Sequence, residues 1–212
     1  MPSNNARDGV ADEYIWPSSR PAHNHSYLLP ALLKVLGPAN GRTVLDVGCG
    51  NGSLTARLAA AGFQCTGLEH AESGVEQASL AFPDVTFGTH DVNEPLPADL
   101  RGRFDVVLAA EVIEHLFLPR KLFARASEAL APGGTLVITT PYHGYWKNLA
   151  LAVTNKYDFH WRPSWDYGHI KFFSRSTLEE MAVECGYRPS SFDRIGRVPA
   201  LAKTMILTAA RT

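Results

Sequence analysis

The sequence predicts an α/β fold in which a mostly parallel sheet carries helices on both faces. From Gly41 onward, short apolar and β-branched runs alternate with helical patterns, which is typical of consecutive βαβ units. The run Val44–Val47 leads directly into three glycines spaced two residues apart, as expected where a buried parallel strand turns sharply into a helix. At 212 residues, the chain is long enough for one domain with a full hydrophobic core.

Predicted strands and helices follow one another regularly through the chain. Strands are predicted at 43–47, 65–69, 85–90, 104–110, 135–140, 191–196 and 203–210. Helices are predicted at 28–36, 53–61, 72–82, 119–130 and 176–185. For the last helix, Ser176 and Glu179 have the spacing of a capping box, and Gly186 is placed to end it.

The glycine spacing separates two classes of nucleotide site. A dinucleotide fingerprint is Gly-x-Gly-x-x-Gly, and Ser53 stands where its third glycine is required, so a nicotinamide oxidoreductase is a distant alternative. The chain instead has Asp46, Gly48, Gly50 and Gly52 in the pattern Asp-x-Gly-x-Gly-x-Gly. Glycines let the backbone approach a ligand closely, and the following helix directs free N–H groups to the same place. A plain glycine turn is the other interpretation.

This pattern resembles motif I of the class I S-adenosylmethionine-dependent methyltransferases. The segment Leu130–Ile138 is also similar to the Leu-x-Pro-Gly-Gly turn before the fifth strand of that family. The resemblance extends over about residues 28–210 and implies a Rossmann-like, seven-stranded sheet in the order 3-2-1-4-5-7-6, with the last strand antiparallel. It also implies S-adenosylmethionine as the cofactor and S-adenosylhomocysteine as the product.

Acidic residues after the second and third strands complete the expected cofactor site. Glu69 ends the second strand, where a carboxylate can accept hydrogen bonds from both hydroxyls of a ribose, and the family binds the cofactor's ribose there. By the same resemblance, Asp91 binds the adenine amino group and Val92 lies beside the ring. The expected cofactor-binding residues are Asp46, Gly48, Cys49, Gly50, Gly52, Glu69, His70, Asp91, Val92 and Glu111.

Two glutamates and a histidine follow the fourth strand. Glu111, Glu114 and His115 are three and four residues apart and would share one face of a helical turn. Because neighbouring carboxylates repel each other, a divalent cation such as Mg²⁺, Mn²⁺ or Zn²⁺ would suit this face. The pattern resembles the metal-binding segment of the ubiquinone-biosynthesis O-methyltransferases and of the small-RNA 2′-O-methyltransferases. That resemblance adds His169 as a fourth candidate ligand.

The same histidines have a second interpretation without a metal. Many methyltransferases of this fold carry Glu-His after the fourth strand and bind no cation. His115 or His169 would then be the catalytic general base, because imidazole titrates near neutrality. A hydroxyl acceptor must lose its proton during methyl transfer, so either interpretation favours methylation of oxygen.

The aromatic segment 142–167 is expected to select the methyl acceptor. Its rings either form a lid over an aromatic or sugar-like acceptor or build a small separate core. The chain is expected to divide into an N-terminal leader with a cap helix, 1–40, and a cofactor-binding domain, 41–212, into which this substrate cap is inserted. In related enzymes the leader folds over the cofactor, so His25 and Tyr27 are candidate contacts.

Composition limits the remaining choices. The net charge of −1 and the absence of long basic runs disfavour a nucleic-acid partner. Three cysteines without paired spacing and a start without an apolar signal region predict a cytoplasmic location, and no segment could span a membrane. The predicted function is O-methylation of a small molecule such as a catechol, sugar or acid, with a homodimer as an option. The alternatives are an RNA 2′-O-methyltransferase and a non-catalytic, cofactor-binding partner subunit.

Overall fold

The computed structural model describes residues 14–159, 161 and 164–212, and it confirms the predicted sheet. Seven strands lie in the order β3-β2-β1-β4-β5-β7-β6. β7 runs antiparallel to both of its neighbours, and the other described pairs are parallel. The strands are β1 Thr43–Val47, β2 Gln64–Glu69, β3 Thr86–Thr89, β4 Phe104–Ala110, β5 Leu130–Pro141, β6 Tyr187–Ile195 and β7 Thr204–Arg211.

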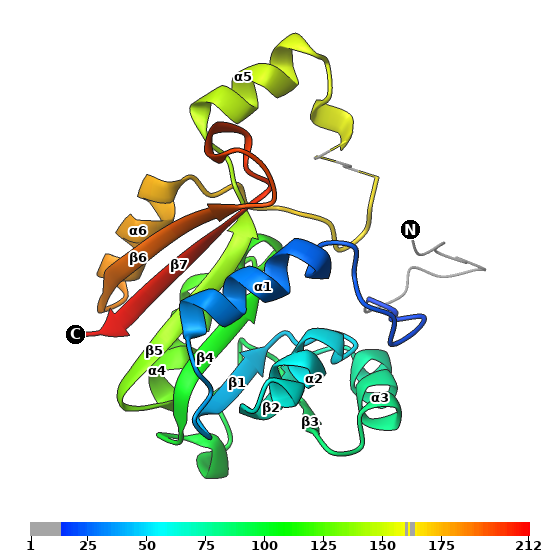
Figure 1. Cartoon of the computed structure of the whole chain (residues 1–212), viewed down its shortest axis with the longest axis vertical. Helices are drawn as coiled ribbons and strands as arrows, with labels where there is room; N and C mark the ends of the chain where they lie inside the picture. Colours follow the sequence, from blue (N-terminus) through cyan, green and yellow to red (C-terminus); the bar gives the residue numbers. More distant parts are fainter. Residues whose placement is uncertain (1–13, 160, 162–163) are drawn as a thin grey trace.

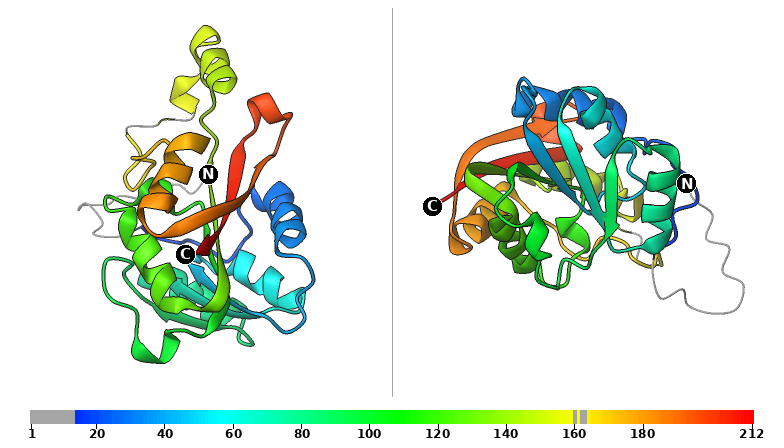
Figure 2. Two further views of the ribbon diagram at one scale, coloured as in Figure 1. Left: turned by 90° about the vertical axis from the view of Figure 1, so that its left-hand side faces the viewer. Right: turned by 90° about the horizontal axis from the view of Figure 1, so that it is seen from below.

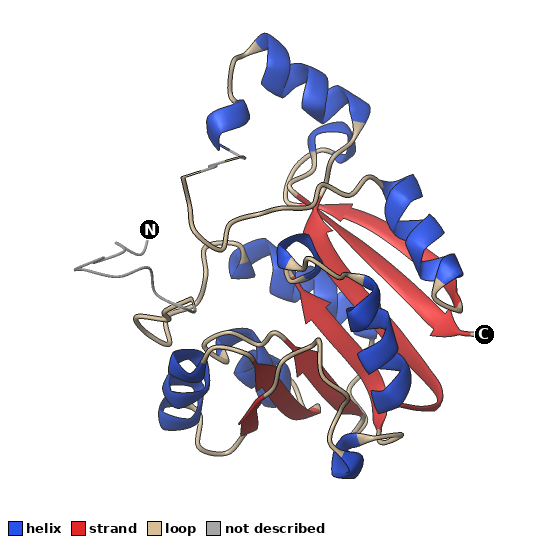
Figure 3. Ribbon diagram, turned by 180° about the vertical axis from the view of Figure 1, so that it is seen from behind, coloured by secondary structure: helices blue, strands red, loops and turns tan. Residues whose placement is uncertain are grey.

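Helices cover both faces of this sheet. The helices are α1 His25–Leu36, α2 Ser53–Ala60, α3 Glu72–Ala81, α4 Arg120–Ala129, α5 Tyr145–Val153 and α6 Arg175–Glu184. Short 3-10 turns form η1 Ala98–Leu100, η2 Ile113–His115, η3 Tyr157–Phe159 and η4 Pro199–Leu201. Figure 1 shows α1, α2 and α3 on the near face, and Figure 3 shows α4 and α6 on the opposite face.

Alternating side chains along each central strand separate two hydrophobic cores. In β4, Val106 and Leu108 pack with Leu32 of α1 and Leu58 of α2. Their neighbours Val107 and Ala109 belong to the other core, with residues of α4 and α6. Because successive side chains of a strand point to opposite faces, a strand covered on both sides must be apolar throughout. This two-sided burial holds the carboxyl ends of β1 and β4 side by side.

The start of α6 differs from its predicted cap. Ser174 is the N-cap: its Oγ accepts a hydrogen bond from the Thr177 amide, and the Thr177 hydroxyl accepts one from the Ser174 amide. The prediction of Ser176 and Glu179 as the capping pair was therefore wrong. Ser174 and Thr177 form the capping box instead, because a threonine hydroxyl at the third helical position can accept from the N-cap amide as a glutamate carboxylate does. Gly186, with a φ of +81°, follows the helix as predicted.

β5 begins earlier than predicted. Leu130 already pairs with Phe104, and the register then shifts before Val106 pairs with Thr135. The Pro-Gly-Gly stretch is therefore an irregularity inside the strand, where Gly133 has a φ of +80°, and it is not a turn that precedes the strand.

α5 lies in the segment for which the sequence predicted no regular element. Figures 1 and 2 show it beyond the ends of the strands, next to the tip of the β6–β7 hairpin, where it contacts η4. Its inward residues are Lys147 and Leu151, one turn apart. Among the described residues, no helix is both long enough and apolar enough to cross a membrane.

Candidate active site

The loop between β1 and α2 requires glycine at three positions. Gly48, Gly50 and Gly52 have φ values of +75°, +57° and +73°, a region that side-chain-bearing residues rarely adopt. A Cβ on Gly48 would lie 2.6 Å from the Val112 side chain, and one on Gly52 would lie 2.6 Å from Ala78. The loop is therefore a tight cradle that only glycines can form, as the sequence predicted.

Trp16 of the leader covers this cradle, and sequence reasoning missed it. A Cβ on Gly50 would lie 2.5 Å from Cζ2 of the Trp16 ring. The Trp16 amide donates to Ser73 Oγ at 3.1 Å, which ties the leader to α3. Asn51 of the loop donates from Nδ2 to the carbonyls of Ser18 and Arg20 at 2.7 and 2.9 Å. The available signal was a lone Trp-Pro pair upstream of a helix, which does not identify its distant contact.

Asp46, the first residue of the motif, has one unsatisfied oxygen. Its side chain is 1% exposed, and Oδ2 accepts a hydrogen bond from the Thr55 hydroxyl at 2.7 Å. Oδ1 is buried without a hydrogen-bond partner among the described residues. Burial raises the pKa of Asp46 to about 6, and the nearby Glu69 contributes in the same direction. A buried acceptor without a partner fits a cationic or N–H group of a bound ligand.

Glu69 is also held at this edge of the sheet. Oε2 accepts from the Gly50 amide at 2.8 Å, and Oε1 accepts from the Ala71 amide at 3.0 Å. Because each carboxylate oxygen has a further lone pair, the group can still accept hydroxyls. His70 beside it is exposed.

The remaining cofactor candidates lie around the same sheet edge. Asp91 follows β3, and its Oδ1 accepts from the amide and side chain of Asn93 at 2.8 and 2.9 Å. Val92 is partly buried against the core. Cys49 is buried in the loop, and burial raises the pKa of its thiol well above the usual range, so the thiol stays neutral.

A cavity of about 160 Å³ lies between the glycine loop and the leader. Trp16, His25, Asp46, Gly50 and Glu111 contribute to its walls. Pockets for ligands of drug size are usually about 300 to 1,000 Å³, so the leader must move for a whole nucleoside to enter. A larger cavity of about 740 Å³ lies at the opposite ends of the strands, near Thr43 and Thr86, and contains none of the expected site residues.

Glu111 lines the smaller cavity, between the glycine loop and the leader, and its backbone is strained. Its φ is +58°, and its amide donates to the Thr139 carbonyl at 3.0 Å. The Thr139 hydroxyl donates to Oε1 at 2.8 Å. Burial raises the pKa of Glu111 to about 7, although Thr139 and the positive charge of Lys147 oppose that shift. The left-handed residue ends β4 before the short turn η2 begins, so the single helical face predicted for Glu111, Glu114 and His115 does not form.

Glu114, His115 and His169 do come together. One potential ligand atom from each lies within 4.8 Å of the others. Glu114 is fully buried, its Oε2 accepts from the Thr140 hydroxyl at 2.9 Å, and its Oε1 has no hydrogen-bond partner among the described residues. Oε1 lies 4.0 Å from Nε2 of His169. Glu111 stays outside this group.

The segment that carries His169 is anchored to η2. The amides of Ile170 and Lys171 both donate to the Glu114 carbonyl, at 2.9 and 3.0 Å. Nδ1 of His115 bonds the Tyr167 carbonyl at 2.9 Å, and because a carbonyl only accepts, this nitrogen carries the proton. Nε2 of a neutral His115 therefore keeps its lone pair. Burial lowers the pKa of His115, which favours this neutral form.

The three groups fit a divalent cation after a small closure. Ligand atoms at about 2.0 to 2.2 Å from one ion are separated by at most about 4.4 Å, slightly less than the 4.8 Å spread found here. The unsatisfied Oε1 of Glu114 is the observation that favours a cation, since a buried carboxylate oxygen normally has a partner. A protonated His169 would satisfy the same oxygen.

Part of the aromatic segment forms a small separate core, and its role as a lid over the methyl acceptor stays a prediction. Trp161 packs against Tyr157 and Phe172, with ring centroids 4.8 and 4.3 Å apart, and these rings form a small separate core. Trp165 instead lies 6.5 Å from the His115 ring and 6.1 Å from the His169 ring, and 41% of it is exposed. Trp165 is therefore the described ring that borders the histidine pair.

Residues 20–191 match the family model described as a methyltransferase domain. Two curated relatives are ubiquinone biosynthesis O-methyltransferases. The protein from Psychrobacter arcticus is 31% identical over 69% of this chain and 59% of its own length. The one from Caulobacter sp. is 35% identical over 66% of this chain and 57% of its own length. The chain thus spans less than two thirds of these relatives.

Solved structures share the fold at lower identity. The magnesium protoporphyrin IX methyltransferase of Synechocystis, crystallised with bound SAH, is 21% identical with a TM-score of 0.63, and the match covers 87% of this chain and 80% of that one. A SAM-dependent methyltransferase from Aquifex aeolicus is 18% identical with a TM-score of 0.66, and the match covers 90% and 93% of the two chains.

Proposed function

This chain belongs to the methyltransferase domain family, the class I S-adenosylmethionine-dependent methyltransferases, and from that premise we propose that it methylates a hydroxyl oxygen of a small molecule. The relatives named as O-methyltransferases support transfer to oxygen. The near-neutral net charge supports a small acceptor over RNA, because RNA binding usually needs a broad basic surface.

The glycine cradle and its acidic neighbours are the proposed cofactor site. The unsatisfied Oδ1 of Asp46 would accept a hydrogen bond from the amino group at the methionine end. Glu69 would bind the ribose hydroxyls, and Asp91 and Val92 the adenine. When bound, S-adenosylmethionine supplies an electrophilic methyl group on a sulfonium. The remaining proposed contacts are Gly48, Cys49, Gly50, Gly52, His70 and Glu111.

The observation that carries the proposal is the cluster of buried Glu114 with half-buried His115 and His169, of which Glu114 and His115 lie on the segment next to the cradle. Val112 of this segment contacts Gly48, so the cluster and the cradle share a border. We assign His115 and His169 to removal of the acceptor's proton. They act either as ligands of Mg²⁺ or Zn²⁺ together with Glu114, or directly as a base. Glu111, the fourth predicted ligand, would have to turn away from Thr139 to join them.

The test is turnover of methyl-labelled S-adenosylmethionine with a panel of catechols, sugars and hydroxy acids, with and without a chelator. Turnover that is lost on chelation and restored by Mg²⁺ or Zn²⁺ supports the metal form. Turnover that ignores the chelator but falls in His115→Ala and His169→Ala supports the base form. Binding of S-adenosylhomocysteine without methylation of any acceptor would favour the non-catalytic partner subunit, and salt-dependent retention of RNA would favour the RNA enzyme.

The fold supports the following division of the chain into functional segments. We propose residues 41–212 as the methyltransferase domain, 142–167 as its substrate cap, and the leader with α1, 1–40, as a cover for the cofactor. Residues 1–13 of that leader lie outside the described part of the chain. The cytoplasmic location and the homodimer stay predictions.

A further inference from the structure

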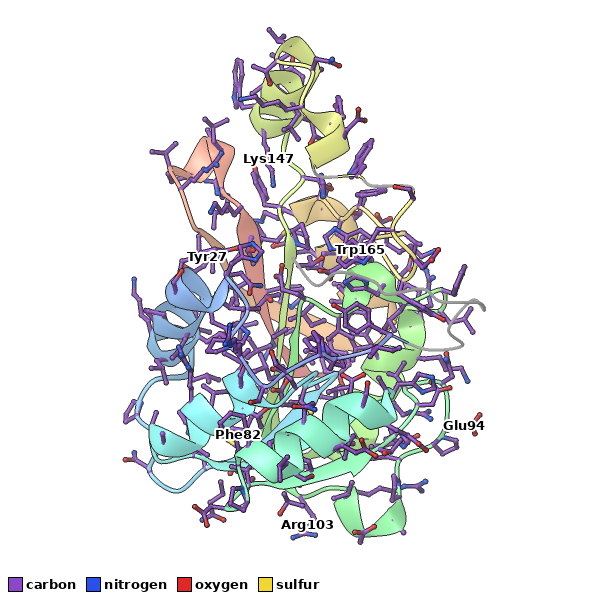
Figure 4. All side chains as sticks on the ribbon, turned by 90° about the vertical axis from the view of Figure 1, so that its right-hand side faces the viewer. Tyr27, Phe82, Glu94, Arg103, Lys147 and Trp165 are labelled. Carbon is purple, nitrogen blue, oxygen red and sulfur yellow. The ribbon has the colours of Figure 1, made fainter. Side chains whose placement is uncertain are left out.

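Helix α5 buries its lysine and exposes its aromatic residues. Lys147 is 6% exposed, whereas its neighbours Tyr145 and Trp146 are 73% and 63% exposed. This is the reverse of the usual preference, since lysine is almost never fully buried unless it has a partner. Figure 4 shows Lys147 below α5, on the side of the helix that faces the strand ends. Because burial of a charged group is energetically costly, the position of Lys147 indicates that its charge has a function.

The ammonium group of Lys147 has few partners. Nζ donates to the Lys203 carbonyl at 3.3 Å, and no other hydrogen bond or ion pair of Lys147 is found among the described residues. An ammonium has three donors, and a buried charge without compensation is costly. Burial lowers the pKa of Lys147 to about 8, so the group remains largely charged at neutral pH. Among the described residues, no anion is therefore in contact with this ammonium.

Glu111 is the nearest candidate for a counter-charge, but it does not reach the lysine. The two groups influence each other's pKa through their charges, yet they form no ion pair at contact distance. Glu111 is instead held by Thr139 and lines the cavity beside the glycine loop. The Glu111 carboxylate and the Lys147 ammonium therefore lie in one polar region without an ion pair between them.

Other polar groups lie in the same region as Glu111 and Lys147. The Tyr27 hydroxyl lies 3.3 Å from the hydroxyl of buried Thr204, and the charge of Glu111 reaches Tyr27 as well. Thr204 follows Lys203, whose carbonyl binds Lys147. Thr204 is also a hydrogen-bond partner of the Glu111 side chain, so Glu111, Tyr27, Thr204 and Lys147 form one polar cluster, which meets the cavity beside the glycine loop at Glu111. With the cofactor in the cradle, an acceptor whose hydroxyl faces the methyl group would lie beside this polar cluster.

We propose that Lys147 binds a carboxylate of the methyl acceptor, so that the substrates are hydroxylated organic acids. This inference rests on the proposed function, because it assumes that the methyl acceptor binds beside this polar cluster. It narrows the acceptor from any small molecule with a hydroxyl to one that also carries negative charge. Lys147 would fix the acid end, which orients the hydroxyl toward the cradle.

The experiment compares two probes that differ by one carboxylate, 3,4-dihydroxybenzoate and catechol. Their affinities for the protein saturated with S-adenosylhomocysteine are measured by calorimetry at pH 7. We expect the wild type to prefer the acid at least about tenfold, as a charge-assisted hydrogen bond provides. Lys147→Met should lose this preference and still bind catechol as the wild type does. Lys147→Arg, which keeps the charge, should retain part of the preference.

Arg197→Met is the matched control. Arg197 is an exposed cation whose charge reaches Lys147, so its removal tests whether the general positive potential explains the preference. It should leave the preference unchanged. Lys147→Met should also fold, because an apolar side chain often replaces a buried charge without loss of stability.

Three results would overturn the assignment. They are a wild type without preference for the acid, a Lys147→Met variant that keeps the preference, and a Lys147→Met variant that loses affinity for S-adenosylhomocysteine. The last would place Lys147 on the cofactor's own carboxylate. Failure of the proposed function would differ from these three results, because the wild type itself would then not bind S-adenosylhomocysteine.

Discussion

The ring of Trp16 lies directly on the backbone of Gly50, close enough that a Cβ on the glycine would be 2.5 Å from Cζ2 of the indole. The two residues are far apart in sequence and meet on the surface where the glycine cradle would receive a nucleoside. Because of this contact, a change at the proposed cofactor site also affects how firmly the leader is held.

Gly50→Ala is expected to weaken S-adenosylhomocysteine binding at least about tenfold and to destabilise the protein by about 1 to 3 kcal/mol. The added methyl group would push Trp16 away and would strain a residue at a φ of +57°. Calorimetry and urea unfolding measure the two effects. Gly102→Ala is the control, because Gly102 has a φ of +65° but no neighbour within 4 Å of the place that an added methyl group would take. Equal losses of affinity in both variants would contradict the prediction.

Trp16 is expected to move when the cofactor binds. The cavity of about 160 Å³ beneath it is too small for a nucleoside, and Trp16 forms part of its wall. Titration with S-adenosylhomocysteine should therefore change the tryptophan fluorescence of the wild type. Trp16→Phe should bind the ligand but lose most of this change. If the variant shows the same change as the wild type, one of the other tryptophans is responsible and the leader does not move.

Asp46→Asn is expected to stabilise the protein without cofactor at neutral pH. Burial raises the pKa of Asp46 from 3.8 to about 6, so the folded state holds this proton more tightly than the unfolded chain. The corresponding stability is present below about pH 4 and is lost as the pH rises through about 6. At pH 7 the ionised group costs roughly 2 to 3 kcal/mol, which the amide avoids while it can still accept from Thr55.

Urea unfolding between pH 3.5 and 8 checks this prediction. The free energy of unfolding of the wild type should fall relative to Asp46→Asn across the window and then remain lower. The variant should also bind S-adenosylhomocysteine more weakly. Two parallel stability curves would show that Asp46 titrates alike in both states.

Glu114→Gln is expected to remove stabilisation by divalent cations. Zn²⁺ or Mg²⁺ at 100 times its dissociation constant would stabilise a specific site by about 2.7 kcal/mol, and the thermal midpoint of the wild type should rise by several degrees. The amide keeps the side-chain volume and can still accept from Thr140, but it cannot ionise and is a weaker ligand for a cation than a carboxylate. His70→Ala, which removes an exposed histidine outside the cluster, should respond as the wild type does. If the wild type does not respond to either cation, the metal form is wrong, and a direct role of His115 or His169 as the base is the alternative.

Local sequence patterns were sufficient for the strands and for the cradle, whereas the order of the strands in the sheet came from the resemblance to a known family. Strands buried on both faces must be apolar along their whole length, as Val106 to Ala109 are, and a chain that reverses tightly at the end of β1 needs glycine at Gly48, Gly50 and Gly52. Glu69 could be placed near the cradle because the carboxyl ends of neighbouring parallel strands meet at one edge, whereas Asp91 came from the family resemblance. The resemblance to a known family supplied His169 as a candidate.

Contacts between distant segments were decided only by the tertiary structure. Nothing local indicates that Trp16 rests on Gly50, or that α5 turns Lys147 inward, because each side chain is placed by packing against residues more than thirty positions away. Glu111 shows the same limit within one short segment: its left-handed φ directs the carboxylate to Thr139 and away from Glu114. Periodicity describes how one element faces a core, whereas a site depends on how several elements face one another.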